Sequence, residues 1–211
     1  MDRIVIIGGG GHAKVVISIL KKLKRFEVFG YVDKNDKGAL LGCRFLGNDN
    51  VLGEMLESQG VKTAAMGLGM LGDDAVRKDL SKRAEALGFE FPAVISPDAR
   101  LNEEAVIGDG TVVMDGSVIN SGTSVGKFCI INTNATIDHD CRIADNVHIA
   151  PGAVLCGGVE VGEGSLIGAG ATVIQYRKIA QNVIIGAGAV ITDDCDCPGT
   201  YVGVPAKLLV K

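Results

Sequence analysis

The chain has 211 residues, a formal net charge of −4, 30 glycines and only 4% aromatic residues. This length suits one large domain or two small ones, and the weak negative charge gives no general attraction to nucleic acid or to an anionic membrane. So many glycines and so few aromatic residues favour a regular, repetitive architecture over an ordinary globular core.

The first residues, MDRIVIIGGGG, lack the basic start and the long apolar stretch of a secretory signal peptide. No apolar run approaches the roughly 18 residues that a membrane-spanning helix needs. We therefore expect a cytoplasmic protein whose six cysteines are free thiols. Their spacing has no pair of Cys-x-x-Cys units, so we expect no metal.

Residues 1–92 are predicted to form a Rossmann-like β-α-β-α-β domain. Residues 3–7 form a buried strand, and the helix after it has an apolar face at 3.6-residue spacing, made of Val15, Val16, Ile19, Leu20 and Leu23. Further strands are expected at residues 26–33 and 62–69, and a second helix at residues 73–87. This order of elements is typical of one half of a nucleotide-binding fold.

The loop between the first strand and helix is rich in glycine. Gly8, Gly10 and Ala13 match the spacing of the dinucleotide-binding fingerprint, and Asp33 follows where an acid would bind ribose. Only one mononucleotide-binding half precedes residue 95, so a nucleoside diphosphate fits better than a nicotinamide cofactor. Loop amides and the helix N-terminus would hold its phosphates. The glycines expected to do so are Gly9, Gly10 and Gly11, unless the loop is purely structural.

A hexapeptide repeat fills residues 93–211 and replaces this pattern. An aliphatic residue occupies every sixth position, without insertion, from Ile95 to Ile191. The position four residues further on holds a small side chain, and only Arg177 breaks that column. A fixed period of six predicts short parallel strands, three to a coil, with Gly or Asn in the strained turns. We therefore expect a left-handed parallel β-helix, an exception to the usual right-handed crossover.

Four features together resemble the bacterial sugar acyltransferases: GGGGHAKVV in the first domain, the uninterrupted hexapeptide repeat, NTNATIDHDCRI within it, and the ending YVGVPAK. That family includes UDP-4-amino-sugar N-acetyltransferases of the bacillosamine pathway, perosamine N-acetyltransferases and sialic acid O-acetyltransferases. The resemblance implies an acetyl-CoA-dependent N-acetyltransferase for a nucleotide-activated amino sugar, a UDP-4-amino-4,6-dideoxy sugar, in bacterial surface glycan synthesis. It also implies a homotrimer with active sites between subunits.

The residue chemistry agrees with acetyl transfer, which needs a base and donors for the developing oxyanion. His139 is the candidate general base, because imidazole is the side chain that titrates near neutral pH. The resemblance gives Asp140 the role of orienting it. Neighbouring residues in a strand point to opposite faces, so that contact needs a turn or a neighbouring subunit. Asp138 is expected to be a solvated turn acid.

The resemblance assigns roles to five further residues. The side chain of His148 and the backbone N–H of Gly157 would hold the acetyl carbonyl or coenzyme A. Asn132 would face the acceptor sugar, and His12 the nucleotide sugar. Lys207 would pair with a phosphate of the coenzyme. Structural roles remain open for two of them, since His148 could stabilise its coil and His12 could cap its helix.

Three other functions are compatible with parts of the sequence. Sialic acid O-acetylation would use the same family motifs, but its hydroxyl nucleophile would need stronger assistance from the base. A non-enzymatic nucleotide-binding scaffold would need only the first domain. A zinc hydratase of the gamma carbonic anhydrase type would need three histidines, and the repeat contains only His139 and His148.

Overall fold

The computed structural model describes residues 1–70 and 75–209. These residues form two compact units, Met1–Pro97 and Asp98–Lys211, and each is described by itself. The first two residues of the predicted helix at 73–87 lie outside the described residues.

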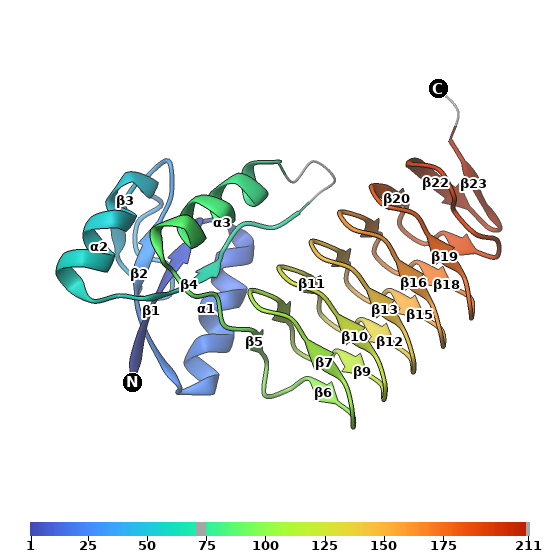
Figure 1. Cartoon of the computed structure of the whole chain (residues 1–211), viewed down its shortest axis with the longest axis horizontal. Coiled ribbons are helices and arrows are strands. Elements are labelled where there is room, and N and C mark those ends of the chain that lie inside the picture. Colours follow the sequence, from blue (N-terminus) through green and yellow to red (C-terminus); the bar gives the residue numbers. More distant parts are fainter. Residues whose placement is uncertain (71–74, 210–211) are drawn as a thin grey trace. The chain divides into compact units, whose positions relative to one another are not determined.

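The first unit contains a four-stranded parallel sheet in the order β3-β2-β1-β4 (Figure 1). Its strands are β1 (Asp2–Ile7), β2 (Phe26–Val32), β3 (Phe45–Gly47) and β4 (Thr63–Met66), with β5 (Val94–Ile95) at the end of the unit. Its helices are α1 (Gly11–Leu23), the short 3-10 helix η1 (Asp49–Val51), α2 (Leu52–Gln59) and α3 (Ala75–Leu87). The predicted Rossmann-like architecture is confirmed, and β3, η1 and α2 are additions to it.

One position on the apolar face of α1 was predicted wrongly. Val15 is 38% exposed, whereas Ile17 is completely buried. At 100° per residue the arc through Ala13, Val16, Ile17 and Leu20 is continuous, and Val15 lies outside it. Val16, Ile19 and Leu20 are buried as predicted, and Leu23 is half buried.

The second unit is a parallel β-helix with three faces. The β13 face contains β7 (Val106–Ile107), β10 (Ser124–Val125), β13 (Arg142–Ile143), β16 (Glu160–Val161) and β19 (Lys178–Ile179). The β12 face contains β6 (Arg100–Leu101), β9 (Val118–Ile119), β12 (Thr136–Ile137), β15 (Val154–Leu155), β18 (Thr172–Val173) and β21 (Val190–Ile191). The β14 face contains β8 (Val112–Val113), β11 (Ile130–Ile131), β14 (His148–Ile149), β17 (Leu166–Ile167), β20 (Val183–Ile185), β22 (Gly199–Gly203) and the antiparallel β23 (Ala206–Leu208).

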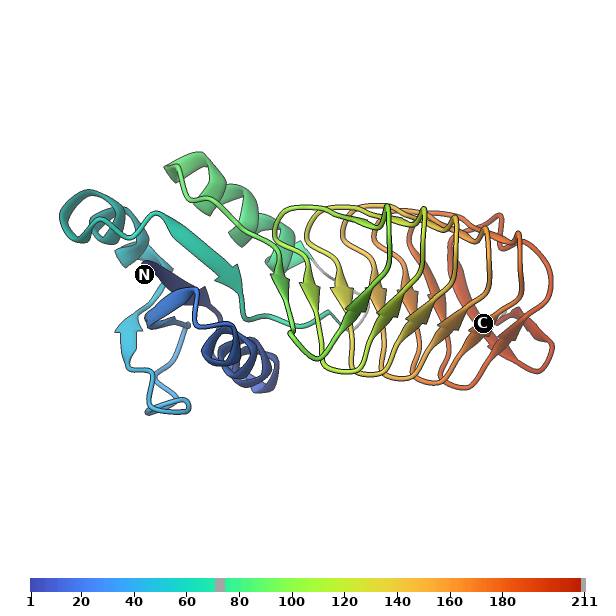
Figure 2. The same ribbon diagram turned by 90° about the horizontal axis from the view of Figure 1, so that it is seen from below.

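From β6 to β21 each strand of a face pairs with strands 18 residues away, as in Thr136 with Val154, and β20 pairs with β22 at an offset of 16 residues. Figure 2 shows the successive coils side by side. The predicted aliphatic column is buried from Val113 to Ile191 and fills the interior of the coils. This architecture confirms the left-handed β-helix predicted from the hexapeptide period.

The turns repeat the same backbone conformation. Every sixth residue from Glu104 to Gly188 has a positive φ, between 54° and 73°. Glycine and asparagine hold most of these positions, as predicted, because they tolerate the left-handed region. At Phe128, Asp140 and Tyr176 the larger side chain lies over a glycine of the previous coil. Phe128 does so at Gly110, where an added Cβ would lie 2.5 Å from the ring.

Buried hydroxyls complete the hydrogen bonding at several corners. Thr111, Thr123 and Ser165 are fully buried, and each donates to a carbonyl 15 residues ahead. Each also accepts from an amide 18 residues ahead. One hydroxyl therefore satisfies two backbone groups of the next coil that would otherwise be buried without a partner.

Candidate functional site

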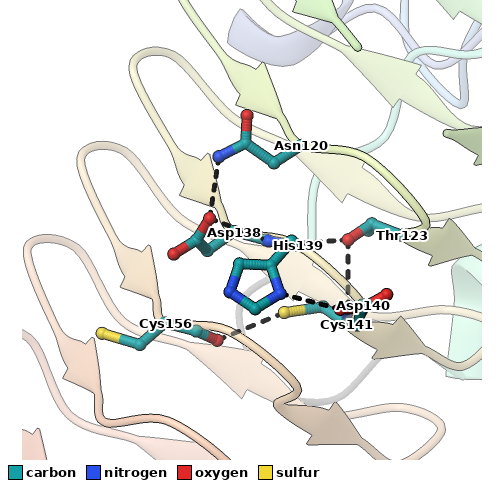
Figure 3. Close-up of polar contacts among 7 residues, drawn as sticks. All are labelled: Asn120, Thr123, Asp138, His139, Asp140, Cys141 and Cys156. Atoms are coloured by element: carbon teal, nitrogen blue, oxygen red, sulfur yellow. Dashed lines mark hydrogen bonds and ion pairs between the residues drawn. The ribbon is translucent and has the colours of Figure 1, made fainter. Parts of the chain in front are cut away.

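The turn at residues 138–141 joins β12 to β13 and carries His139 (Figure 3). Thr123 of the previous coil bridges its two ends. Its Oγ1 donates to the carbonyl of Asp138 at 2.7 Å and accepts from the N–H of Cys141 at 3.1 Å. The carbonyl of His139 accepts from the N–H of Gly158 in the next coil at 2.9 Å. The turn is thus fixed by backbone contacts on both sides.

His139 and Asp140 form a hydrogen-bonded pair within this turn. Their Nδ1 and Oδ2 atoms lie 2.8 Å apart. Asp140 has a φ of 58°, and this left-handed conformation allows two consecutive side chains to meet. The contact therefore needs no second subunit. Because a carboxylate only accepts, Nδ1 carries the hydrogen, and Nε2 keeps the lone pair that a base requires.

The pKa of His139 is raised above its ordinary value. The hydrogen bond to Asp140 is the largest cause, and the negative charges of Asp138 and Asp140 add to it. The imidazole is half exposed, with 51% of its side-chain surface accessible, so substrate can reach it.

Gly157 lies against the imidazole. A Cβ added there would be 2.5 Å from Nε2 of His139, so any side chain would displace the ring. Among the described residues, no group accepts from the N–H of Gly157. One nitrogen of His139 is therefore held by a carboxylate, while the other lies beside an available backbone donor. This pair could remove a proton and bind an oxygen or sulfur atom in the same place.

Asp138 is not the solvated acid that was predicted. It is half buried, and its Oδ1 accepts from Nδ2 of Asn120 and from the N–H of His139, both at 2.8 Å. The bond from Asn120, followed by that from the backbone of His139, lowers the pKa of Asp138. The prediction failed because Asn120 is 18 residues away in the sequence and directly adjacent in the coil stack.

Asn132 and His148 form a second group at a different corner. Nδ2 of Asn132 lies 3.0 Å from Nε2 of His148, which is buried in β14. Asn132 follows β11 at the junction of the β14 and β12 faces, whereas His139 lies at the junction of the β12 and β13 faces. The structure therefore brings His139, Asp140 and Gly157 together, and separates this trio from Asn132 and His148 within one chain.

The glycine loop of the first unit contacts Asp33 through the N–H of Gly9, a bond that was not predicted. The N–H of Gly9 donates to Oδ2 of Asp33 at 2.7 Å, and a Cβ on Gly9 would lie 2.6 Å from the ring of Tyr31. Gly10 and Gly11 have open space around them. Gly9 is thus required by packing, while Gly10 and Gly11 leave the N-terminus of α1 accessible.

A cavity of about 690 Å³ lies at the carboxyl ends of β1 and β2 and includes Asp33. Asp49 and Arg83 also line it, and Nη1 of Arg83 lies 2.9 Å from Oδ2 of Asp49. Neither residue was predicted from the sequence, because they belong to η1 and α3 and match no motif. This cavity is large enough for part of a nucleotide.

The remaining predicted residues lie elsewhere. His12 is half buried in the first turn of α1, where its Cβ lies 3.7 Å from a Cβ placed on Gly69, and it does not line the cavity. Lys207 is exposed in β23, and its Nζ lies 3.3 Å from Oδ2 of Asp193. The cysteines are free, and burial raises the pKa of Cys195 to about 11.

Two absences apply to residues 1–70 and 75–209. No three His, Cys, Asp or Glu side chains there converge as a metal site. None of the helices there is long and apolar enough to cross a membrane.

Two family models match the chain: the PglD N-terminal domain over residues 3–84, and the six-repeat bacterial transferase hexapeptide over residues 140–175. No curated protein matches the sequence.

Solved structures are similar over the whole chain. A histidine-to-asparagine variant of perosamine N-acetyltransferase from Caulobacter crescentus, in complex with CoA and GDP-perosamine, has 37% identity and a TM-score of 0.94, covering 100% of this chain and 98% of that chain. The acetyltransferase domain of PglB from Neisseria gonorrhoeae has 36% identity and a TM-score of 0.91, covering 99% and 100%. WeeI from Acinetobacter baumannii has 26% identity and a TM-score of 0.87, also covering 99% and 100%.

The bridge formed by Thr123 can be tested with a matched pair of variants. Thr123→Val and Thr111→Val each leave a buried carbonyl and a buried N–H without their partner, so each should lower the free energy of unfolding by at least about 2 kcal/mol. Only Thr123→Val should also lower the pKa of His139, followed by NMR titration, because only that change loosens the turn at residues 138–141. An unchanged titration in Thr123→Val would contradict this role.

Proposed function

This chain belongs to the sugar acyltransferases of the left-handed β-helix family, and we propose that it transfers the acetyl group of acetyl-CoA to the amine of a nucleotide-activated amino sugar. The observation that carries this proposal is the imidazole of His139, held by Asp140 at Nδ1 and lying over Gly157 at Nε2. The similarity to a perosamine N-acetyltransferase in complex with CoA and GDP-perosamine supports both substrates.

In the proposed reaction the amine nitrogen attacks the thioester carbonyl carbon. The new C–N bond forms, the carbonyl oxygen becomes negative, and the C–S bond then breaks to release the coenzyme A thiolate. His139 takes the proton from the attacking nitrogen through Nε2 and returns it to the sulfur. Asp140 stabilises the imidazolium in between. The N–H of Gly157 donates to the carbonyl oxygen or to nearby coenzyme, with His148 assisting.

The two parts of the chain have different roles in this proposal. Residues 1–92 bind the nucleotide sugar through Gly10, Gly11 and Asp33, and residues 93–211 carry out acetyl transfer. We propose a UDP-4-amino-4,6-dideoxy sugar used in surface glycan synthesis as the acceptor. GDP is the competing nucleotide, since the relative from Caulobacter crescentus is in complex with GDP-perosamine.

We also propose that the working enzyme is a homotrimer. Within one chain, His139 lies at the junction of the β12 and β13 faces, one corner away from Asn132 and His148. Asn132 and His148 can join His139 in one site only if a neighbouring prism supplies them. Closed cyclic symmetry then gives three equivalent sites.

The base is tested by steady-state rates. His139→Ala should lower turnover by roughly 100- to 10,000-fold with the circular dichroism unchanged, because the side chain is outside the aliphatic column. Asp140→Asn should lower turnover by a smaller factor. Because the neutral imidazole is the active form and Asp140 raises its pKa, this variant should also move the acidic limb of the pH–rate profile to lower pH. Near-normal turnover in His139→Ala would rule out His139 as the general base.

The nucleotide is tested by thermal shift with UDP, GDP, CMP and acetyl-CoA. We expect UDP and acetyl-CoA to stabilise the protein in proportion to ligand concentration over affinity. Gly11→Val should weaken UDP far more than acetyl-CoA, because a branched side chain would separate phosphate from the amides at the start of α1.

Gly53→Val is the matched control for that loop. Gly53 lies in the first turn of α2 and has equally open surroundings, so its variant should bind UDP normally. Equal losses of UDP and acetyl-CoA in Gly11→Val would make the loop structural. Stabilisation by CMP alone would favour sialic acid chemistry.

Assembly is tested by light scattering and by mixed trimers. The mass should be about three times the 21.9 kDa of the chain. Mixing His139→Ala with His148→Ala subunits should restore some activity, since a site can then take one intact residue from each chain. Mixing His139→Ala with Gly157→Val should restore none, because those residues meet within one chain. A fully active monomer would contradict the shared site.

A further inference from the structure

We infer that Asp138 binds the amino group of the acceptor as an ammonium ion, and that it makes the enzyme select an amine over a hydroxyl. This inference rests on the proposed function and adds a specificity-determining residue to it.

A ladder of amides orients the Asp138 carboxylate. Nδ2 of Asn102 donates to Oδ1 of Asn120 at 2.5 Å, and Nδ2 of Asn120 donates to Oδ1 of Asp138 at 2.8 Å. The N–H of His139 donates to the same oxygen. In the part of the chain that the structure describes, no group donates to the second oxygen, Oδ2. Figure 3 shows that oxygen pointing away from Asn120.

The coil itself does not require a carboxylate at this position. Met114, Ala144 and Ile174 occupy the equivalent place after other strands of the repeat. Nor does the turn require one, because Asn132 makes the same side-chain bond, accepting from the N–H of Thr133 at 2.8 Å with a neutral amide. The negative charge of Asp138 therefore has no evident structural purpose.

That charge also has no permanent cation paired with it among the described residues. The bonds from Asn120 and the backbone of His139 lower the pKa of Asp138, so the carboxylate is ionised at neutral pH. Among residues 1–70 and 75–209, no lysine or arginine forms an ion pair with it. When His139 is in the neutral form that acts as a base, it does not offset this charge, so a bound cation would lower the cost of the half-buried anion.

The acceptor of the proposed reaction supplies such a cation. A primary amine is protonated at neutral pH, whereas a hydroxyl is neutral. The ammonium would bind Oδ2 of Asp138 and lose one proton to His139, which releases it to solvent. The neutral amine then attacks the thioester, and its second proton passes through His139 to the departing sulfur. A hydroxyl acceptor gains nothing from the carboxylate, so the two classes of sugar are discriminated.

The test is Asp138→Asn, which keeps an oxygen for both hydrogen bonds and removes only the charge. The KM for the nucleotide amino sugar should rise by about tenfold, because a charge-assisted hydrogen bond becomes a neutral one. The KM for acetyl-CoA should be unchanged. The inhibition constant of the matching sugar with a hydroxyl in place of the amine should also stay unchanged. In wild type alone, the KM for the amino sugar should rise as pH approaches the pKa of the amine.

Asp145→Asn is the matched control. Asp145 also accepts a backbone N–H, that of Lys127 at 2.7 Å, at another turn, so this variant removes the same charge without affecting acceptor binding. An unchanged amino-sugar KM in Asp138→Asn would overturn the inference, as would an equal weakening of the hydroxyl sugar. A wild-type protein that acetylates no nucleotide amino sugar would instead refute the proposed function, and this inference with it.

Discussion

The 18-residue period of the coil is the constraint on which the rest of the second unit depends. It places each residue directly over the one 18 positions earlier, with parallel backbone pairing such as Thr136 with Val154. The turn that carries His139 is therefore built by three coils at once. Thr123 and Asn120 of the previous coil form hydrogen bonds to it, and Gly157 of the next coil lies against the imidazole. A single inserted residue would break all of these contacts together.

The same constraint explains how two acids on either side of one histidine acquire different roles. Asp140 occupies the left-handed turn position and folds back onto Nδ1 of His139. Asp138 directly follows β12 and is held by Asn120 instead. One carboxylate thus controls the imidazole, and the other keeps an oxygen available beside it. Backbone conformation, rather than distance along the chain, separates the two functions.

The sequence predicted the parts that depend on spacing and on family motifs. The period of six predicted the β-helix, and the family resemblance, rather than spacing, suggested that His139 and Asp140 act together. The nature of Asp138 was missed, because its partner Asn120 becomes adjacent only when the coils are stacked. The ion pair of Arg83 with Asp49 in the nucleotide-sized cavity was missed too. Those residues are joined by tertiary packing of α3 and η1, for which no periodic signal exists.

The bridging hydroxyls have a consequence for how the protein resists unfolding. Since Thr111, Thr123 and Ser165 each connect one coil only to the next, cooperativity passes between nearest neighbours along a line. Opening therefore begins at the ends of the stack and spreads inward. His139 lies more than two coils from Asp98 and more than three from Leu209. Amide hydrogens around it should then exchange among the slowest in the second unit, and local fraying at either end leaves the catalytic turn intact.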